Sequence, residues 1–116
     1  MGGPAGGGSW VCVDAVEVEG ASRVGVRWLI TRDDGAENFA MRMFEIEPGG
    51  HTPLHTHAHE HEVFAVEGRG ALVCEGAEHA FEAGYVMFVP PEVEHCFKNT
   101  GDCLLKMLCL IPGSAY

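Results

Sequence analysis

Strand-like apolar runs recur at short intervals along the chain, and turn residues separate them. The runs cover residues 10–18, 24–31, 40–47, 52–57, 62–67, 71–74, 78–80, 86–89, 95–99 and 104–111. Gly- and Pro-rich breakers lie between them, such as those at 33–35, 48–50 and 68–70. No 12-residue window shows a convincing helical period. Many short strands with Gly and Pro turns predict an all-β antiparallel sandwich or barrel.

Length and charge narrow the class of protein. The 116 residues suffice for one domain with one core. The net charge is −10, with seven basic residues against seventeen acidic ones. Such a surface repels phosphate backbones, so we expect no nucleic-acid partner. No apolar run approaches the roughly 20 residues that cross a bilayer, so we expect no membrane partner.

The N-terminus and the cysteines suggest a compartment. Residues 1–9 are glycine-rich and lack the apolar stretch of a signal peptide. We interpret them as a flexible tail and place the folded domain at residues 10–116. The five cysteines are odd in number and form no Cys-x-x-Cys pair. This predicts reduced thiols in a cytoplasmic protein.

The segment 49–61 holds the candidate chemistry. His55 and His57 lie two residues apart, so a strand over 52–57 would place both imidazoles on one face. His61 follows four residues later. Each buried imidazole needs a polar partner, and an apolar core does not supply partners for three histidines at this spacing. The spacing therefore indicates a metal site.

Two linked motifs extend this pattern. The first is Gly49-x5-His55-x-His57-x3-His61-x6-Gly68. The second runs from Gly84 through five residues to Pro90, and ends with His95 and Asn99. Together they resemble the paired signature motifs of the cupin superfamily, and fifteen residues separate them. The resemblance implies a single-domain cupin jelly-roll β-barrel, also called a double-stranded β-helix.

The resemblance also implies a ligand set of His55, His57, His61 and His95 around one metal ion. Two positions depart from the cupin pattern: Glu92 replaces a turn glycine, and His61 stands where most cupins place a glutamate ligand. Glu62 could be forced into the motif. That register leaves only five residues before Gly68 and takes Glu62 off the face shared by His61, Val63 and Ala65. The set of four resembles the small four-histidine manganese cupins of thermophilic bacteria.

Four imidazoles are neutral ligands, so a bound divalent ion would keep its full double charge. It would be a strong Lewis acid that favours anionic or oxygen ligands. Four protein ligands of six would leave two positions open, as catalysis requires. Imidazole binds Mn, Fe, Ni, Cu and Zn, so the ligand type does not single out one metal. The resemblance favours manganese or iron.

The alternation of side chains along the predicted strand 40–47 assigns further residues to the barrel interior. Putting Glu45 and Glu47 outward sends Arg42, Phe44 and Ile46 into the barrel. An inward guanidinium needs a partner. Arg42 would form an ion pair with an internal acid, the commoner solution, or bind an anionic substrate or oxygen species near the metal.

Two more residues, Cys109 in the last predicted strand and His59 in the histidine segment, each have two possible roles. Cys109 faces inward, either as a pocket wall beside Phe44 and Phe97 or, more commonly, as plain core packing. His59 lies between two of the ligands, and we predict that it is a solvated turn residue. An alternative ligand register through His59 stays open.

These features favour a metal-dependent enzyme of the oxygenase type, which activates O2 or a peroxide on a small-molecule substrate. We expect apolar pocket walls at five residues: Phe44, Phe64, Met87, Phe88 and Phe97. The alternatives are a non-redox isomerase, lyase or sugar-acid-converting enzyme, and a non-catalytic protein that binds a metal or small ligand. We also expect a homodimer, with segment 10–18 adding to a partner's sheet and outward Met41 and Met43 supplying apolar contact.

Overall fold

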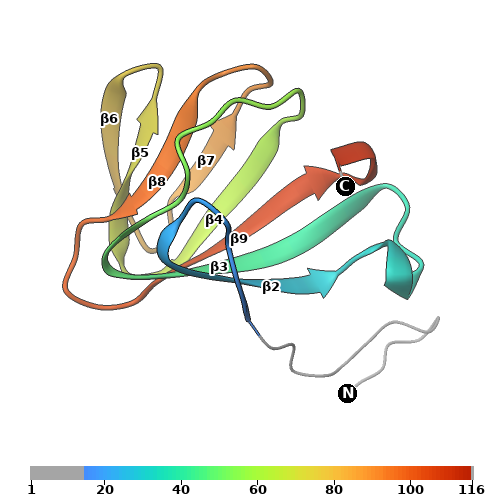
Figure 1. Cartoon of the computed structure of the whole chain (residues 1–116), viewed down its shortest axis with the longest axis horizontal. Coiled ribbons are helices and arrows are strands. Elements are labelled where there is room, and N and C mark those ends of the chain that lie inside the picture. The colour runs from blue at the N-terminus through green and yellow to red at the C-terminus, as the bar shows by residue number, and fades with distance from the viewer. Residues whose placement is uncertain (1–14, 116) are drawn as a thin grey trace.

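The computed structural model describes residues 15–115, whose strands form one curled, nine-stranded antiparallel sheet (Figure 1). The strands are β1 (Val16–Glu17), β2 (Ser22–Ile30), β3 (Phe39–His51), β4 (His61–Glu67), β5 (Arg69–Cys74), β6 (Ala77–Glu82), β7 (Val86–Val89), β8 (His95–Asn99) and β9 (Leu105–Pro112). Two 3-10 turns, η1 (Arg32–Asp34) and η2 (Gly113–Ala115), complete the elements. The all-β jelly-roll prediction is confirmed. Neither turn is long enough to cross a membrane.

The order along the sheet is β6-β5-β8-β3-β9-β4-β7, with β2 paired to β3 and β1 to β2. Apart from the hairpin of β5 and β6, neighbours in this order are not consecutive in the chain, as is typical of a jelly roll. In Figure 1, β5, β6 and β8 stand on one side and the long strands β2, β3 and β9 on the other. The sheet thus curls around a single interior.

Alternating burial shows which face fills this interior. Every second residue of β9 is buried, from Leu105 to Ile111, and β4 buries His61, Val63 and Ala65. Ile46, Leu105 and Met107 are 0 to 1% exposed. Burying a side chain of this kind stabilises the fold by about 1.5–3 kcal/mol. The alternation of apolar and polar residues along these strands therefore identifies the side chains that face the core.

Two predicted boundaries were wrong. The Pro48-Gly49-Gly50 breaker does not end its strand: β3 continues to His51, which pairs with Ser22 of β2 and Lys98 of β8. Gly49 takes a positive φ of 81° there, opposite a register shift in β2. This bulge bends the strand instead of terminating it.

Segment 52–57 was predicted as a strand and is not one. It is an extended loop that touches β8 at two points. Thr52 donates its N–H to the Phe97 carbonyl, and His55 forms an isolated bridge with His95. Pro53 between them has no N–H to donate, so the ladder cannot continue. Of the predicted strand 10–18, only residues 15–18 are described, and β1 covers two of them.

The last motif residue, Asn99, has a structural role. It is buried, and its side-chain amide donates to the carbonyls of Ile46 and Cys103. It thereby ties β8 to β3 and to the turn that follows β8. The four cysteines of the described region are free, in agreement with the predicted reduced thiols.

Candidate metal centre

Three chain segments bring the four predicted ligands to one end of the interior. His55 and His57 lie on the loop between β3 and β4, which runs beside β8 in Figure 1. His61 opens β4, and His95 opens β8. The bridge between His55 and His95 fixes the loop against β8 through two backbone hydrogen bonds of 3.0 and 3.1 Å.

The position of Glu92 anchors the same loop. Its N–H donates to the His57 carbonyl over 2.8 Å. Its φ of 65° lies in the left-handed region that favours glycine. The departure from the motif at this position therefore retains the glycine-like backbone that holds His57.

Each of the four imidazoles uses its Nδ1 atom for a contact within the protein. His55 Nδ1 lies 2.9 Å from the Pro53 carbonyl, His57 Nδ1 3.1 Å from the His59 carbonyl, and His95 Nδ1 2.8 Å from the Val93 carbonyl. His61 Nδ1 instead lies 3.0 Å from Cys109 Sγ. A carbonyl accepts only from a protonated nitrogen, so the three carbonyl contacts leave the Nε2 lone pairs of His55, His57 and His95 for a metal.

The Nε2 sides of the rings converge. One possible ligand atom from each of His55, His57 and His95 lies within 4.8 Å of the others. His61 Nε2 lies 2.7 Å from His57 Nε2. Two nitrogens bound at about 2.1 Å to one ion can be at most about 4.2 Å apart. Small shifts would therefore bring this cluster to ligand distance, and the donors fit a transition-metal ion.

Burial keeps the imidazoles of His57, His61 and His95 neutral. Burial and, next in size, the nearby charge of Arg42 lower the pKa of His61 to about 2. Burial and the neighbouring His59 lower the pKa of His57 to about 4. Burial also lowers the pKa of His95. Since metal binding needs an unprotonated ring nitrogen, the site is ready to bind near neutral pH.

The prediction for His59 as a solvated turn residue is correct only in part. His59 lies in a bend and is partly buried, and it also lines the same cavity. Its ring stacks on His57 with centroids 3.9 Å apart and planes 4° apart. One possible ligand atom from each of His57, His59 and His61 also lies within 4.8 Å of the others. Lone pairs of nearly parallel, stacked rings do not meet at one point, because each lies in its own ring plane. Four pairs within the predicted set are instead inclined by 51° to 76°, and the fifth, His57 with His61, is stacked at 22°.

Arg42 and Cys109 lie behind His61. One guanidinium nitrogen of Arg42, Nη2, donates to Cys109 Sγ over 3.0 Å and lies 3.5 Å from His61 Nδ1. Arg42 and Cys109 are paired directly across β3 and β9. Burial raises the pKa of the Cys109 thiol, while Arg42 opposes that shift. The predicted ion pair with an internal acid was wrong: among residues 15–115, the ion pairs are Arg27–Glu45 and Lys98–Glu78.

The histidines open into a cavity of about 420 Å³. Its apolar wall includes Phe44, Phe97, Val63, Met107 and Ile111. Phe64 and Phe88 were expected there too, and that was wrong, because they are 42% and 57% exposed. Inward His61 and Val63 force Phe64 to the outer face. Met87 is likewise absent from the residues that line the cavity.

Sequence reasoning missed Trp28 and the turn residues Val18 and Glu19, which also line the cavity. Trp28 faces Arg42 across the β2–β3 pair. Inward parity of β2 could have found it. Nothing in the sequence shows that the β1–β2 turn folds toward the histidines.

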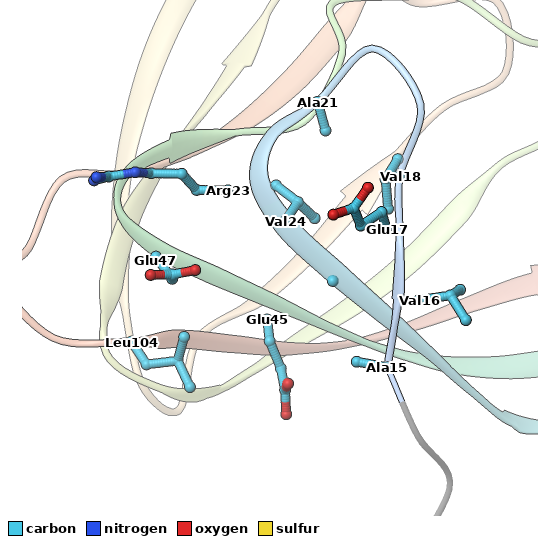
Figure 2. Close-up of a pocket in the computed structure, with 11 residues that line it drawn as sticks. Ala15, Val16, Glu17, Val18, Ala21, Arg23, Val24, Glu45, Glu47 and Leu104 are labelled. Atoms are coloured by element: carbon cyan, nitrogen blue, oxygen red, sulfur yellow. The ribbon is translucent and has the colours of Figure 1, made fainter.

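A second groove lies between the β1–β2 turn and the strands β2 and β3 (Figure 2). Three glutamates line it: Glu17, Glu45 and Glu47. Glu45 is held by Arg27 through two hydrogen bonds. This groove contains no histidine, so the candidate chemistry stays with the histidine cavity.

Comparisons with known proteins agree with this geometry. The structure is similar to the polyketide cyclase RemF from Streptomyces resistomycificus, at 33% identity and a TM-score of 0.82, covering 87% of this chain and 74% of that one. It is also similar to a cupin-2 domain protein from Rhodospirillum rubrum, at 27% identity and a TM-score of 0.79, covering 90% and 72%.

Among curated proteins, the chain is 34% identical over 71 residues to 1-methylthio-D-xylulose 5-phosphate methylsulfurylase from Rhodospirillum rubrum. The match covers 61% of this chain and 46% of that protein. The chain thus spans about half the length of the curated relatives it matches, which are covered to 46% and 50%. The Cupin domain family matches residues 42–111, which include all four candidate ligands. This chain is therefore a member of the cupin family.

Proposed function

We propose that this protein is a metal-dependent enzyme that acts on a small organic molecule. His55, His57, His61 and His95 would hold one divalent transition-metal ion through Nε2. The observation that carries this proposal is the clustering of these four imidazoles at the wall of an apolar cavity, each with an Nδ1 contact to the protein. Supported outer contacts of this kind are typical of metal ligands.

For the reaction class we propose oxygenase-type chemistry, with manganese or iron as the ion. The bound ion would supply Lewis acidity and the electron exchange that O2 or a peroxide requires. The protein's part is to hold the imidazoles neutral, to exclude bulk water with Phe44, Phe97 and Met107, and to place a positive charge beside the site with Arg42. The four-histidine manganese subtype belongs to this proposal.

A second candidate is non-redox carbon chemistry, in which the ion stabilises an enolate. The similarity to a polyketide cyclase at 33% identity favours it, because ring closure by itself requires no oxidant. A protein that binds a metal or small ligand without turnover is the remaining alternative. The same cavity serves all three, so fold alone does not separate them.

Oxygen uptake under defined metal loading tests the proposal. We expect protein purified without an affinity tag and loaded with manganese or iron to consume oxygen with a member of a panel of small organic acids. Zinc-loaded protein and the His57→Ala variant should consume none. Equal turnover with zinc under argon would establish the non-redox candidate. Tight metal binding without turnover of any panel member would contradict an enzymatic role.

We also propose that two copies of the chain associate. Outer-face residues of β3, β4, β7 and β9 form an apolar patch of Met41, Phe64, Val86, Phe88, Leu108 and Leu110. Val86 is 76% exposed, and edge strand β7 pairs with β4 alone among the described strands. The chain carries a net charge of −10, so two copies repel one another over most of their surfaces. This patch is apolar except for Glu62, which lies among its residues, and it is therefore the surface we propose for self-association.

Light scattering at micromolar concentration should give the mass of a dimer. Phe88→Lys should give a monomer, since it puts a charge in the centre of the patch. Leu54→Lys, which changes an equally exposed leucine on the histidine loop, should remain a dimer. A monomeric mass for the unchanged, full-length chain would contradict the proposal.

A further inference from the structure

Arg42 is a cation whose donors are poorly used. Its guanidinium packs against two aromatic rings, 5.3 Å from the Trp28 ring centre and 4.9 Å from that of Phe44. Its hydrogen-bond partner is a sulfur, Cys109 Sγ, which is a weak acceptor. Its Nε is buried and is the one such side-chain nitrogen or oxygen among residues 15–115 that lacks a partner. A guanidinium with five N–H groups thus has donor capacity to spare.

The charge around Arg42 is equally unbalanced. A guanidinium keeps its proton in proteins, so it cannot relieve its burial by becoming neutral. The neighbouring imidazoles are neutral, and a bound divalent ion would add two positive charges. Glu19, on the exposed β1–β2 turn, is the one acid that lines the cavity in the described region. The cavity therefore favours a ligand that brings negative charge.

From this we infer that the cavity binds the carboxylate of a small organic acid at Arg42. A carboxylate matches the planar fork of a guanidinium with two parallel hydrogen bonds. A phosphate monoester carries up to two charges and usually recruits several cationic or backbone donors. Here Arg42 is the only lysine or arginine among the residues that line the cavity. The apolar body of the acid would lie against Phe44, Phe97 and Met107.

The position of His61 orients such a ligand. Its Nδ1 edge faces Arg42 at 3.5 Å, and its Nε2 edge faces His57 at 2.7 Å. The guanidinium and the metal cluster thus lie on opposite edges of one ring. An acid held by its carboxylate at Arg42 can present its other end to the cluster. This assignment rests on the proposed function for its catalytic meaning, but the binding itself can be measured alone.

Calorimetry with benzoate, benzamide and phenyl phosphate tests the assignment, using the full chain with and without zinc. We expect benzoate to bind at least about tenfold more tightly than neutral benzamide, as a charge-assisted hydrogen bond predicts. Arg42→Gln should remove that preference, and Arg42→Lys should keep part of it. Arg27→Gln removes the same charge from the partly exposed pair with Glu45 and should leave benzoate binding unchanged.

Three results would overturn the inference. They are equal benzoate affinity in the unchanged chain and Arg42→Gln, equal affinity for benzoate and benzamide, and tighter binding of phenyl phosphate than of benzoate. The zinc content of each sample separates this inference from the proposed function. Benzoate binding that depends on Arg42 in a chain that takes up no zinc would support the anion site and refute the metal enzyme. Normal zinc uptake without any preference for benzoate would refute the anion site and leave the proposed metal site standing.

Discussion

Replacing His57 with alanine is expected to weaken metal binding by about 100-fold or more, because loss of a ligand should exceed the 10–100-fold effect typical of its supporting contacts. His57 is the most informative histidine to remove. It belongs to both groups of three that come within ligand distance, and its Nε2 lies 2.7 Å from that of His61. Competition with a chelator for zinc or manganese measures the change in affinity.

Matched histidine variants make this result specific. His51 and His79 are exposed and lie outside both groups, so His51→Ala and His79→Ala should bind metal like the unchanged chain. His59→Ala should also retain the metal, since the ring of His59 is stacked nearly parallel on that of His57. A loss at His59 comparable to that at His57 would favour the alternative ligand register.

Replacing His61 with glutamate is expected to weaken azide binding to the metal-loaded protein by at least about tenfold, while the metal stays bound. Two effects act in the same direction. A carboxylate ligand cancels one charge of the ion, and at this position it also comes within reach of Arg42, which lies 3.5 Å from His61 Nδ1. Azide is an anion, so it loses attraction from both. The optical or EPR spectrum of the metal reports azide binding at fixed metal occupancy.

A charge control separates this local effect from the overall charge of the chain. His79→Glu introduces the same carboxylate at an exposed position on β6. It should leave azide binding unchanged. Equal azide affinity in the unchanged chain and His61→Glu would show that the ligand-charge argument is wrong, or that His61 does not contact the metal.

The sequence predicted the parts of the fold that depend on local alternation. Strands β4 and β9 place buried residues at every second position, so their inward faces could be named in advance. Arg42 and Phe44 were assigned to the interior in the same way, and both line the cavity. The double motif then located the four histidines, whose convergence needs strands distant in sequence and could not follow from alternation alone.

The errors arose where tertiary contacts decide the outcome. The loop at 52–57 has strand-like residues, yet Pro53 and two isolated contacts with β8 leave it irregular. His59 lies beyond the predicted strand 52–57, in a loop whose path depends on tertiary contacts, so its stacking on His57 could not be foreseen. Arg42 was expected to find an acid, but the residues opposite it are Trp28 and Cys109, and cross-strand register is not written in the sequence.

The most direct test of the four-histidine site is a crystal structure of the manganese-loaded protein, with the ion located by its anomalous scattering. The account predicts one ion bound by Nε2 of His55, His57, His61 and His95, with the four Nδ1 contacts retained, including that of His61 with Cys109. An ion coordinated by Glu62 or His59 in place of His61 would contradict it.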